Sequence, residues 1–243
     1  MLEELKRAVW QANLTLGRSG LAPGTWGNVS GLDRRRGVFA IKPSGVAYEK
    51  LGLGDIVLVD LEGKVVEGAL RPSSDTATHL EIYRAFEAAG GITHTHSSVA
   101  VAFAQAEVAI PCFGTTHADH FDGTVPVTRM LTADEVARDY EKNTGAVIVE
   151  TFATARIDPG RMPAVLVAGH GPFTWGADAA RSVENAVALE AVAAMARDTF
   201  LLRSCRDAGR AIPDHLLRKH FDRKHGPGRY YGQAVEGTTS DDA

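Results

Sequence analysis

The 243-residue sequence is poor in the features that mark several specialised classes of protein. Its two cysteines, Cys112 and Cys205, are too few for a disulfide framework, and we interpret them as reduced thiols. It has no run of about 18 apolar residues and no apolar signal core near its first residue, so we expect a cytoplasmic protein without a membrane span. Its formal net charge of −4 gives no general attraction to nucleic acids or anionic membranes. It also lacks the GxGxxG and Walker patterns of nucleotide sites.

The segments that remain predict one mixed α/β domain. Helical spacing and capping residues predict helices over 2–16, 73–91, 98–106, 132–145, 178–206 and 214–226. β-rich runs predict strands over 37–45, 91–97, 146–151 and 164–170, and a hairpin over 55–68. The irregular alternation favours a mixed sheet covered by helices. No linker divides residues 1–233, and the small polar residues 234–243 predict a disordered tail.

Histidines near the ends of two predicted strands indicate a metal site. His94 and His96 are two residues apart, so within a strand they would point to the same face. His170 ends the run AVLVAGH and precedes a Gly-Pro pair, which we expect to form a turn. Three imidazoles suit Zn²⁺ and leave a position open for substrate. A pair of hydrogen-bonded core histidines is the alternative for His94 and His96. His117 and His120 lie in a polar loop that could line the same cleft.

Three further segments could hold an anion. GTWGNVSG (24–31) offers Asn28 and the amides of a Gly-rich turn. IKPSG (41–45) offers Lys42 and Ser44, and RPSSDT (71–76) offers Ser73 and Ser74 at a helix N-terminus. Each segment alone fits an ordinary turn or cap. Together with a metal site, they predict a phosphorylated small-molecule substrate.

The combination of these segments resembles the class II aldolase/adducin family over 1–233. The resemblance is carried by TWGNVS (25–30), IKPSGV (41–46), PSSDT (72–76), THTHS (93–97), GTTHAD (114–119), TGAVIVETF (144–152), GHGPFTWG (169–176), RKHG (223–226) and YYGQ (230–233). It implies a single-domain α/β fold with a mixed, mainly antiparallel central sheet covered by helices on both sides.

The resemblance also implies a role for each matching residue. The metal ligands would be Asp75, His94, His96 and His170, holding one Zn²⁺, or another divalent ion such as Mn²⁺, per subunit. The phosphate would be held by Gly27, Asn28, Ser44, Gly45, Ser73 and Ser74, with Lys42 nearby. Asp119 and Tyr231 would be the acid/base pair, and Tyr231 would reach the site from a neighbouring subunit of a homotetramer. Supporting residues near the substrate would be Thr115, Glu141, His220 and Arg223.

The implied activity is the interconversion of L-ribulose 5-phosphate and D-xylulose 5-phosphate. The C3–C4 bond would be broken and remade through an enediolate that the metal stabilises. In the aldolase branch of the family a Glu stands near the position of Asp75. The Asp in this sequence therefore favours the epimerase branch. The alternatives are a metal-dependent sugar-phosphate aldolase and a non-catalytic module like the adducin branch. The basic segment 217–229 we interpret as lining a site or subunit interface rather than as a nucleic-acid patch.

Overall fold

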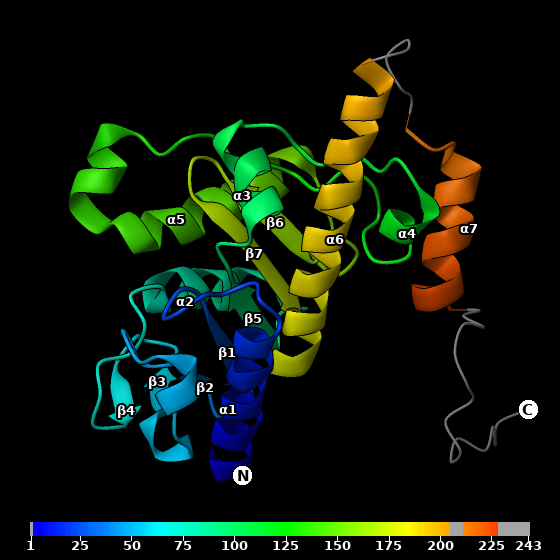
Figure 1. Cartoon of the computed structure of the whole chain (residues 1–243). Coiled ribbons are helices and arrows are strands. Elements are labelled where there is room, and N and C mark those ends of the chain that lie inside the picture. The colour runs from blue at the N-terminus through cyan, green and yellow to red at the C-terminus, as the bar shows by residue number, and fades with distance from the viewer. Residues whose placement is uncertain (1, 205–210, 228–243) are drawn as a thin grey trace, which may run out of the picture.

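A seven-stranded sheet with helices on both faces forms the body of the protein (Figure 1). The computed structural model describes residues 2–204 and 211–227. The strand order is β4-β3-β2-β1-β5-β7-β6, and every ladder within the described residues is antiparallel. The strands are β1 (Asn28–Asp33), β2 (Val38–Ile41), β3 (Val57–Asp60), β4 (Val65–Glu67), β5 (Gly91–His94), β6 (Ala164–Val167) and β7 (Gly171–Gly176). The predicted fold class and the predicted 55–68 hairpin are confirmed.

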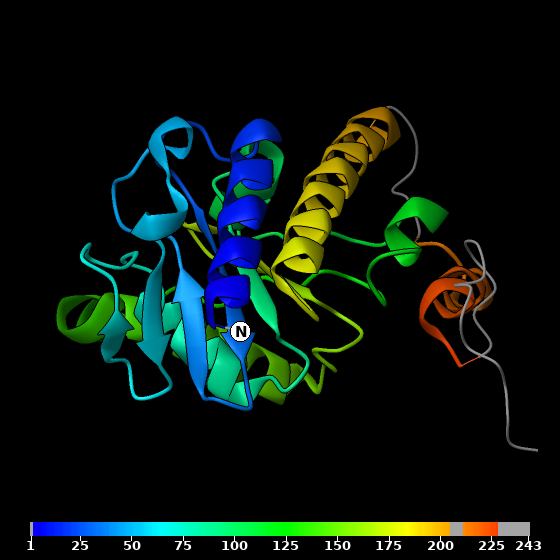
Figure 2. The same cartoon turned by 90° about the horizontal axis from the view of Figure 1, so that it is seen from below.

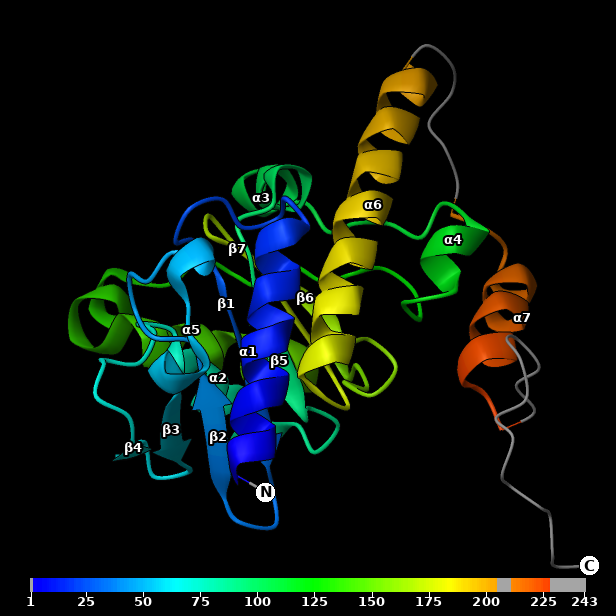
Figure 3. The ribbon, with the colours of Figure 1, turned by 60° about the horizontal axis from the view of Figure 1, so that its bottom comes forward.

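Helices α1 (Leu2–Arg18) and α6 (Ala179–Ser204) lie together over one face of the sheet, and α2 (Thr76–Ala85) and α5 (Ala133–Ala155) pack together on the other (Figure 2). The remaining helices are α3 (Ser98–Gln105), α4 (Thr115–Ala118), α7 (Asp214–His225) and two 3-10 turns, Tyr48–Lys50 and Leu53–Asp55. The α4–α7 pair lies on the side of α6 away from α5 (Figure 3).

Successive side chains of a strand contribute alternately to two apolar clusters, one on each face of the sheet. In β3, Val57 and Val59 join the cluster that contains α2, whereas Leu58 joins the cluster that contains α1. In β2, Phe39 and Ala40 divide in the same way. This is expected for a sheet that is covered on both faces, because successive side chains point to opposite sides.

The prediction of a strand over 146–151 was wrong, because this segment continues helix α5. Thr132 and Glu135 form a capping box at its start. Gly145 does not end the helix: it permits close packing, since a Cβ there would lie 2.6 Å from the Cβ of Glu81 on α2. The apolar residues that suggested a strand are the buried stripe of α5.

The prediction of a Gly-Pro turn after His170 was also wrong. Gly171–Gly176 forms β7, which is buried throughout and lies between β5 and β6. The actual turn spans 168–170, and His96 lies two residues beyond the end of β5. Among the described residues, no helix combines the length and apolar character that a membrane span needs. Tyr231 and the predicted tail over 234–243 lie outside the described residues.

Candidate active site

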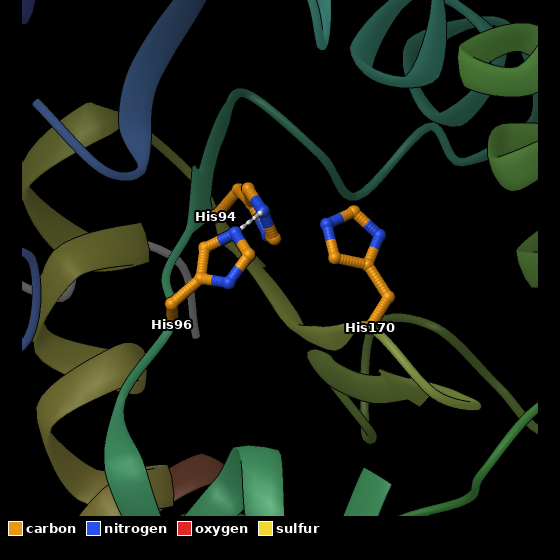
Figure 4. Close-up of side chains that lie close together, drawn as sticks. All are labelled: His94, His96 and His170. Carbon is orange, nitrogen blue, oxygen red and sulfur yellow. Dashed lines mark hydrogen bonds between the residues drawn. The ribbon is translucent and has the colours of Figure 1, made fainter. Parts of the chain in front are cut away.

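Three histidines meet at one end of the sheet, although 76 positions separate the first from the last. His94 is the last residue of β5, His96 follows it, and His170 lies in the turn between β6 and β7. One nitrogen from each ring lies within 4.8 Å of the other two (Figure 4). The pairing of β5 with β7 brings His94 opposite Phe173, and so holds the two segments in register.

The hydrogen bonds of His94 indicate which of its two ring nitrogens faces the other histidines as an acceptor. Its Nδ1 lies 3.0 Å from the carbonyl oxygen of Pro172, which can only accept, so Nδ1 carries the proton. In the neutral ring with its proton on Nδ1, Nε2 carries the lone pair, and this atom lies 3.1 Å from Nε2 of His96. Two nitrogens bound to one tetrahedral Zn²⁺ at about 2.0–2.1 Å lie about 3.3–3.4 Å apart. The donor set therefore fits a divalent metal ion.

The charge state of the other two imidazoles agrees with this fit. Burial lowers the pKa of His170 to about 4, with a further contribution from His94. Burial, followed by His94, also lowers the pKa of His96. Both rings are neutral near pH 7, which is the form that binds metal.

Asp75 lies beside the three histidines, at the N-terminus of α2. Its Oδ2 accepts a hydrogen bond of 2.6 Å from Nδ2 of Asn28. Burial alone would raise the pKa of Asp75, but His94, His79 and the Asn28 bond more than offset it, so the pKa falls below its ordinary value. Within the described residues, the atoms close enough to bind one ion together belong to the three histidines. Asp75 is not one of this group, but it adds a negative charge next to them.

A cavity of about 600 Å³ joins the histidines to all seven residues expected to bind phosphate. The expected residues that line it are Gly27, Asn28, Lys42, Ser44, Gly45, Ser73, Ser74, Asp75, His94, His96, Glu141 and His170. Gly27 has a φ of +69°, and a Cβ there would lie 2.5 Å from the carbonyl oxygen of His94. Only glycine fits this close approach between the Gly-rich turn and β5.

Lys42 supplies the cavity with a buried positive charge. It is 1% exposed, and its Nζ lies 3.4 Å from the carbonyl oxygen of Pro43 and 5.0 Å from the centre of the Tyr48 ring. Burial lowers its pKa to about 8. Among the described residues, no carboxylate forms an ion pair with it. An anion in the cavity would supply the missing countercharge.

The expected acid/base residue Asp119 lies elsewhere, at the end of α4. Arg223 on α7 donates two hydrogen bonds to its carboxylate, at 3.1 and 2.7 Å. Nδ1 of His220 lies 3.0 Å from Oδ1, and Nζ of Lys224 lies 3.6 Å from Oδ2. We call these four residues the Asp119 cluster. Burial alone would raise the pKa of Asp119, but the hydrogen bonds from Arg223 and His220 hold it below its ordinary value, so the group is an ionised carboxylate.

The Asp119 cluster borders a second cavity, of about 570 Å³, which shares no lining residue with the first. This cavity contacts Gly176, at the far end of β7 from His170. A strand of six residues spans about 20 Å. One chain therefore does not bring Asp119, His220 and Arg223 to the histidines. Thr115 begins α4, the short helix that ends at Asp119. The expected partner Tyr231 lies outside the described residues.

Three further histidines, His79, His117 and His120, lie in the core or at the second cavity. His79 is fully buried, its Nδ1 lies 2.7 Å from the hydroxyl of Ser30, and burial lowers its pKa to about 3. His117 is buried and bonds the carbonyl of Gly123 at 2.7 Å, and His120 lines the second cavity. Within one chain, His117 and His120 therefore do not line the cavity of the three histidines.

Comparison with known proteins identifies the family. Residues 7–197 match the family described as the class II aldolase and adducin N-terminal domain. The chain belongs to this family. It is 53% identical to the L-ribulose-5-phosphate 4-epimerase UlaF of Salmonella paratyphi C, over 96% of this chain and all of the relative.

Solved structures of the class II aldolase and adducin family share the fold. An L-fuculose 1-phosphate aldolase superposes with a TM-score of 0.71 at 25% identity, covering 90% of this chain and 95% of that one. The L-fuculose-1-phosphate aldolase of Thermus thermophilus gives a TM-score of 0.65 at 27% identity, covering 86% of this chain and 100% of that one. The resemblance seen in the sequence is confirmed.

Four residues that sequence reasoning did not single out line the first cavity of this family member: Thr25, Trp26, Pro43 and Tyr140. Thr25, Trp26 and Pro43 are neighbours of expected residues, so adjacency could have found them. Tyr140 likewise precedes the expected residue Glu141, and it reaches the cavity at a break in helix α5 at Asp139, where φ is −146° and ψ is 67°.

Proposed function

We propose that the protein is a metal-dependent epimerase that interconverts L-ribulose 5-phosphate and D-xylulose 5-phosphate at C4. The observation that carries the proposal is one cavity that combines three imidazoles with a buried lysine and a Gly-rich turn. A pentulose phosphate would place its ketose oxygens at the histidine end of such a cavity and its phosphate at the lysine end. The 53% identity to an L-ribulose-5-phosphate 4-epimerase, over its whole length, supports this substrate.

His94, His96 and His170 would hold the divalent ion, with Asp75 beside it, and Zn²⁺ suits this nitrogen-rich set, with Mn²⁺ as the alternative. Bound there, the ion supplies a Lewis acid for the negative charge that develops on the substrate oxygens. Three imidazoles and one neighbouring carboxylate would leave the site with a net positive charge, which suits this task.

The phosphate end of the cavity would retain the substrate during the reaction. C4 bears no acidic hydrogen, so inversion requires cleavage of the C3–C4 bond, whose electron pair moves onto the C2 carbonyl and gives an enediolate and glycolaldehyde phosphate. The aldehyde must rotate so that the bond re-forms on the opposite face of its carbonyl group. Lys42, Asn28 and the N-terminus of α2 would hold its phosphate and prevent its escape.

Two proton-transfer groups are needed, because the C4 hydroxyl points in opposite directions in the two epimers. In each direction one group removes the hydroxyl proton as the bond breaks, and the other protonates the C4 oxygen after the bond re-forms. We assign these roles to Asp119 and Tyr231. Their ionised and phenolic forms are suited to accept and to donate a proton respectively, and the roles exchange in the reverse reaction.

A homotetramer would bring the two halves of the site together. Because Asp119 and the histidines border separate cavities of one chain, we propose that Asp119 of one subunit, with Tyr231, serves the metal cavity of its neighbour. A head-to-tail contact of this kind closes into a ring when the rotation between copies is cyclic.

The test is to incubate the Zn²⁺- or Mn²⁺-loaded protein with L-ribulose 5-phosphate and to follow D-xylulose 5-phosphate and free glycolaldehyde phosphate together. The proposal predicts xylulose product without accumulation of the aldehyde. Released aldehyde, or cleavage of a deoxyketose phosphate but no reaction with this ketose, would instead establish the aldolase activity that the structural neighbours' names suggest. A non-catalytic module would give neither product and would bind no stoichiometric metal.

A further inference from the structure

A tyrosine hydroxyl contacts the outer nitrogen of the third histidine. Oη of Tyr140 lies 3.3 Å from Nδ1 of His170, and the two rings are tilted by 34° with centres 6.1 Å apart. In Figure 4 the other ring nitrogen of His170, Nε2, points toward His94 and His96, whereas Nδ1 points away from them. Tyr140 therefore contacts the side of the imidazole that does not face the proposed ion.

The fold holds Tyr140 in this place from both sides. Helix α5 breaks at Asp139, and the residues after the break are anchored by a hydrogen bond of 2.6 Å from Thr78 to the carbonyl of Glu141. Asn143 donates a hydrogen bond of 2.8 Å back to the carbonyl of Glu135, across the break.

An arginine also joins the two parts of α5 on either side of the break. Arg129 donates hydrogen bonds of 2.7–3.2 Å to the carboxylates of Glu135 and Glu150. In a continuous helix, Tyr140 would point in a different direction relative to Glu135. The break at Asp139 and the hydrogen bonds around it therefore determine where the phenol lies.

The geometry points to Tyr140 as a positioning residue for the metal ligand His170. A histidine that binds an ion through Nε2 keeps its proton on Nδ1, and that N–H needs an acceptor that fixes the tautomer and the ring orientation. For His94 this acceptor is the carbonyl of Pro172. For His170 this acceptor is Oη of Tyr140. Because Oη is a side-chain atom, a substitution can remove it. The inference rests on the proposed metal site and adds a residue to it.

The test compares Tyr140→Phe with Tyr48→Phe. Tyr140→Phe keeps the ring and removes only the acceptor. Tyr48→Phe removes another phenol near the cavity, one that donates a hydrogen bond of 2.9 Å to the carbonyl of Trp26 and contacts none of the three histidines. Zn²⁺ affinity is measured by competition with a chromophoric chelator, and the Co²⁺-loaded proteins are compared by visible absorption, which reports ligand geometry. Loss of an outer partner of a metal ligand typically weakens binding about 10–100-fold.

We expect Tyr140→Phe to bind Zn²⁺ weaker by that factor and to alter the Co²⁺ spectrum, whereas Tyr48→Phe matches the parent protein. Thermal unfolding of the metal-free proteins separates this effect from general damage: the Tyr140→Phe protein should unfold at the parent temperature. Equal Zn²⁺ affinity and an unchanged Co²⁺ spectrum in Tyr140→Phe would overturn the inference while leaving the proposed function intact. Absence of stoichiometric binding in the parent protein would instead overturn the proposed metal site itself.

Discussion

The cavity around His94 and the cluster around Asp119 differ in charge, in construction and in completeness. The first gathers imidazoles at a strand end and in a tight turn. In it, His94 contacts a backbone carbonyl and Asn28 donates a hydrogen bond to Asp75. The second places one carboxylate among three basic side chains, on two helices that lie outside the sheet. The sheet fixes the first region, whereas ion pairs fix the second.

This difference indicates a division of labour. A metal site needs ligands placed to within a fraction of an ångström, and a sheet provides that rigidity. A proton-transfer group must instead reach the substrate from outside, and helices at the periphery can supply it to another copy of the chain. The predictions below alter one region at a time, so that each shows whether the regions act separately or as one site.

The largest effect is expected from removal of a proposed metal ligand. His96→Ala should abolish stoichiometric Zn²⁺ binding and lower epimerisation by about 10³-fold or more, because the ion contributes several kcal/mol of charge stabilisation. Metal analysis and turnover on L-ribulose 5-phosphate measure the two effects. Full turnover in a metal-free variant would separate the histidines from the reaction.

Removal of the carboxylate in the second region should leave the first region unchanged. Asp119→Asn should lower epimerisation by about 10²–10⁴-fold while the protein keeps its metal, because it removes a proton acceptor but no ligand. Asp122→Asn is the matched control, since Asp122 pairs with Arg161 and with Arg218 of α7 but is not assigned to proton transfer. Equal losses in both variants would mean that Asp119 only docks α7.

Lys42→Met should weaken substrate binding by about 10–100-fold, since a buried hydrogen bond to a charged group is worth about 1.5–3 kcal/mol. KM should rise with little change in kcat, and the exposed Lys50→Met serves as the control. Because the pKa of Lys42 is lowered to about 8, its charge is present below that pH and lost above it. KM of the parent protein should therefore rise as the pH passes upward through about 8, and a pH-independent KM in that range would contradict the assignment.

The smallest effect concerns the docking of α7 on α4. The pKa of Asp119 is lower in the folded protein than its ordinary value of 3.8, so its ion pairs stabilise the folded state above that value. This stability is lost as the pH falls through the lowered pKa. Relative to the intrinsic exchange rate at each pH, amide protection of α7 should fall on acidification in the parent protein and depend less on pH in Asp119→Asn. Identical pH profiles would show that other contacts hold α7.

Local sequence patterns predicted the order of most helices and strands and the histidine half of the candidate site. The His-x-His spacing and the strand-end position of His170 reflect short-range geometry, which a sequence displays directly. The Gly-rich turn, the Lys42 segment and the Ser73-Ser74 cap were likewise visible, and the cavity brings them together.

The misassigned segments depend on contacts between distant residues. Residues 146–151 have β-branched side chains but form a helix, because their apolar stripe packs on α2 and the sheet. The Pro in GPFTWG suggested a turn, yet the segment is a central strand that pairs with β5 and β6. Neither the position of Tyr140 nor the separation of Asp119 from the histidines could be read from spacing, since both follow from tertiary packing.

Subunit complementation tests the two-region account most directly. Protein that carries His96→Ala and protein that carries Asp119→Asn are each nearly inactive, and the two are co-expressed and purified as hybrids. If each site combines the histidines of one subunit with Asp119 of the next, random assembly leaves about a quarter of the sites with both halves intact. The account predicts recovery of about that fraction of parent activity. Activity no greater than that of the separate variants would show that both halves of each site come from one chain, and would contradict it.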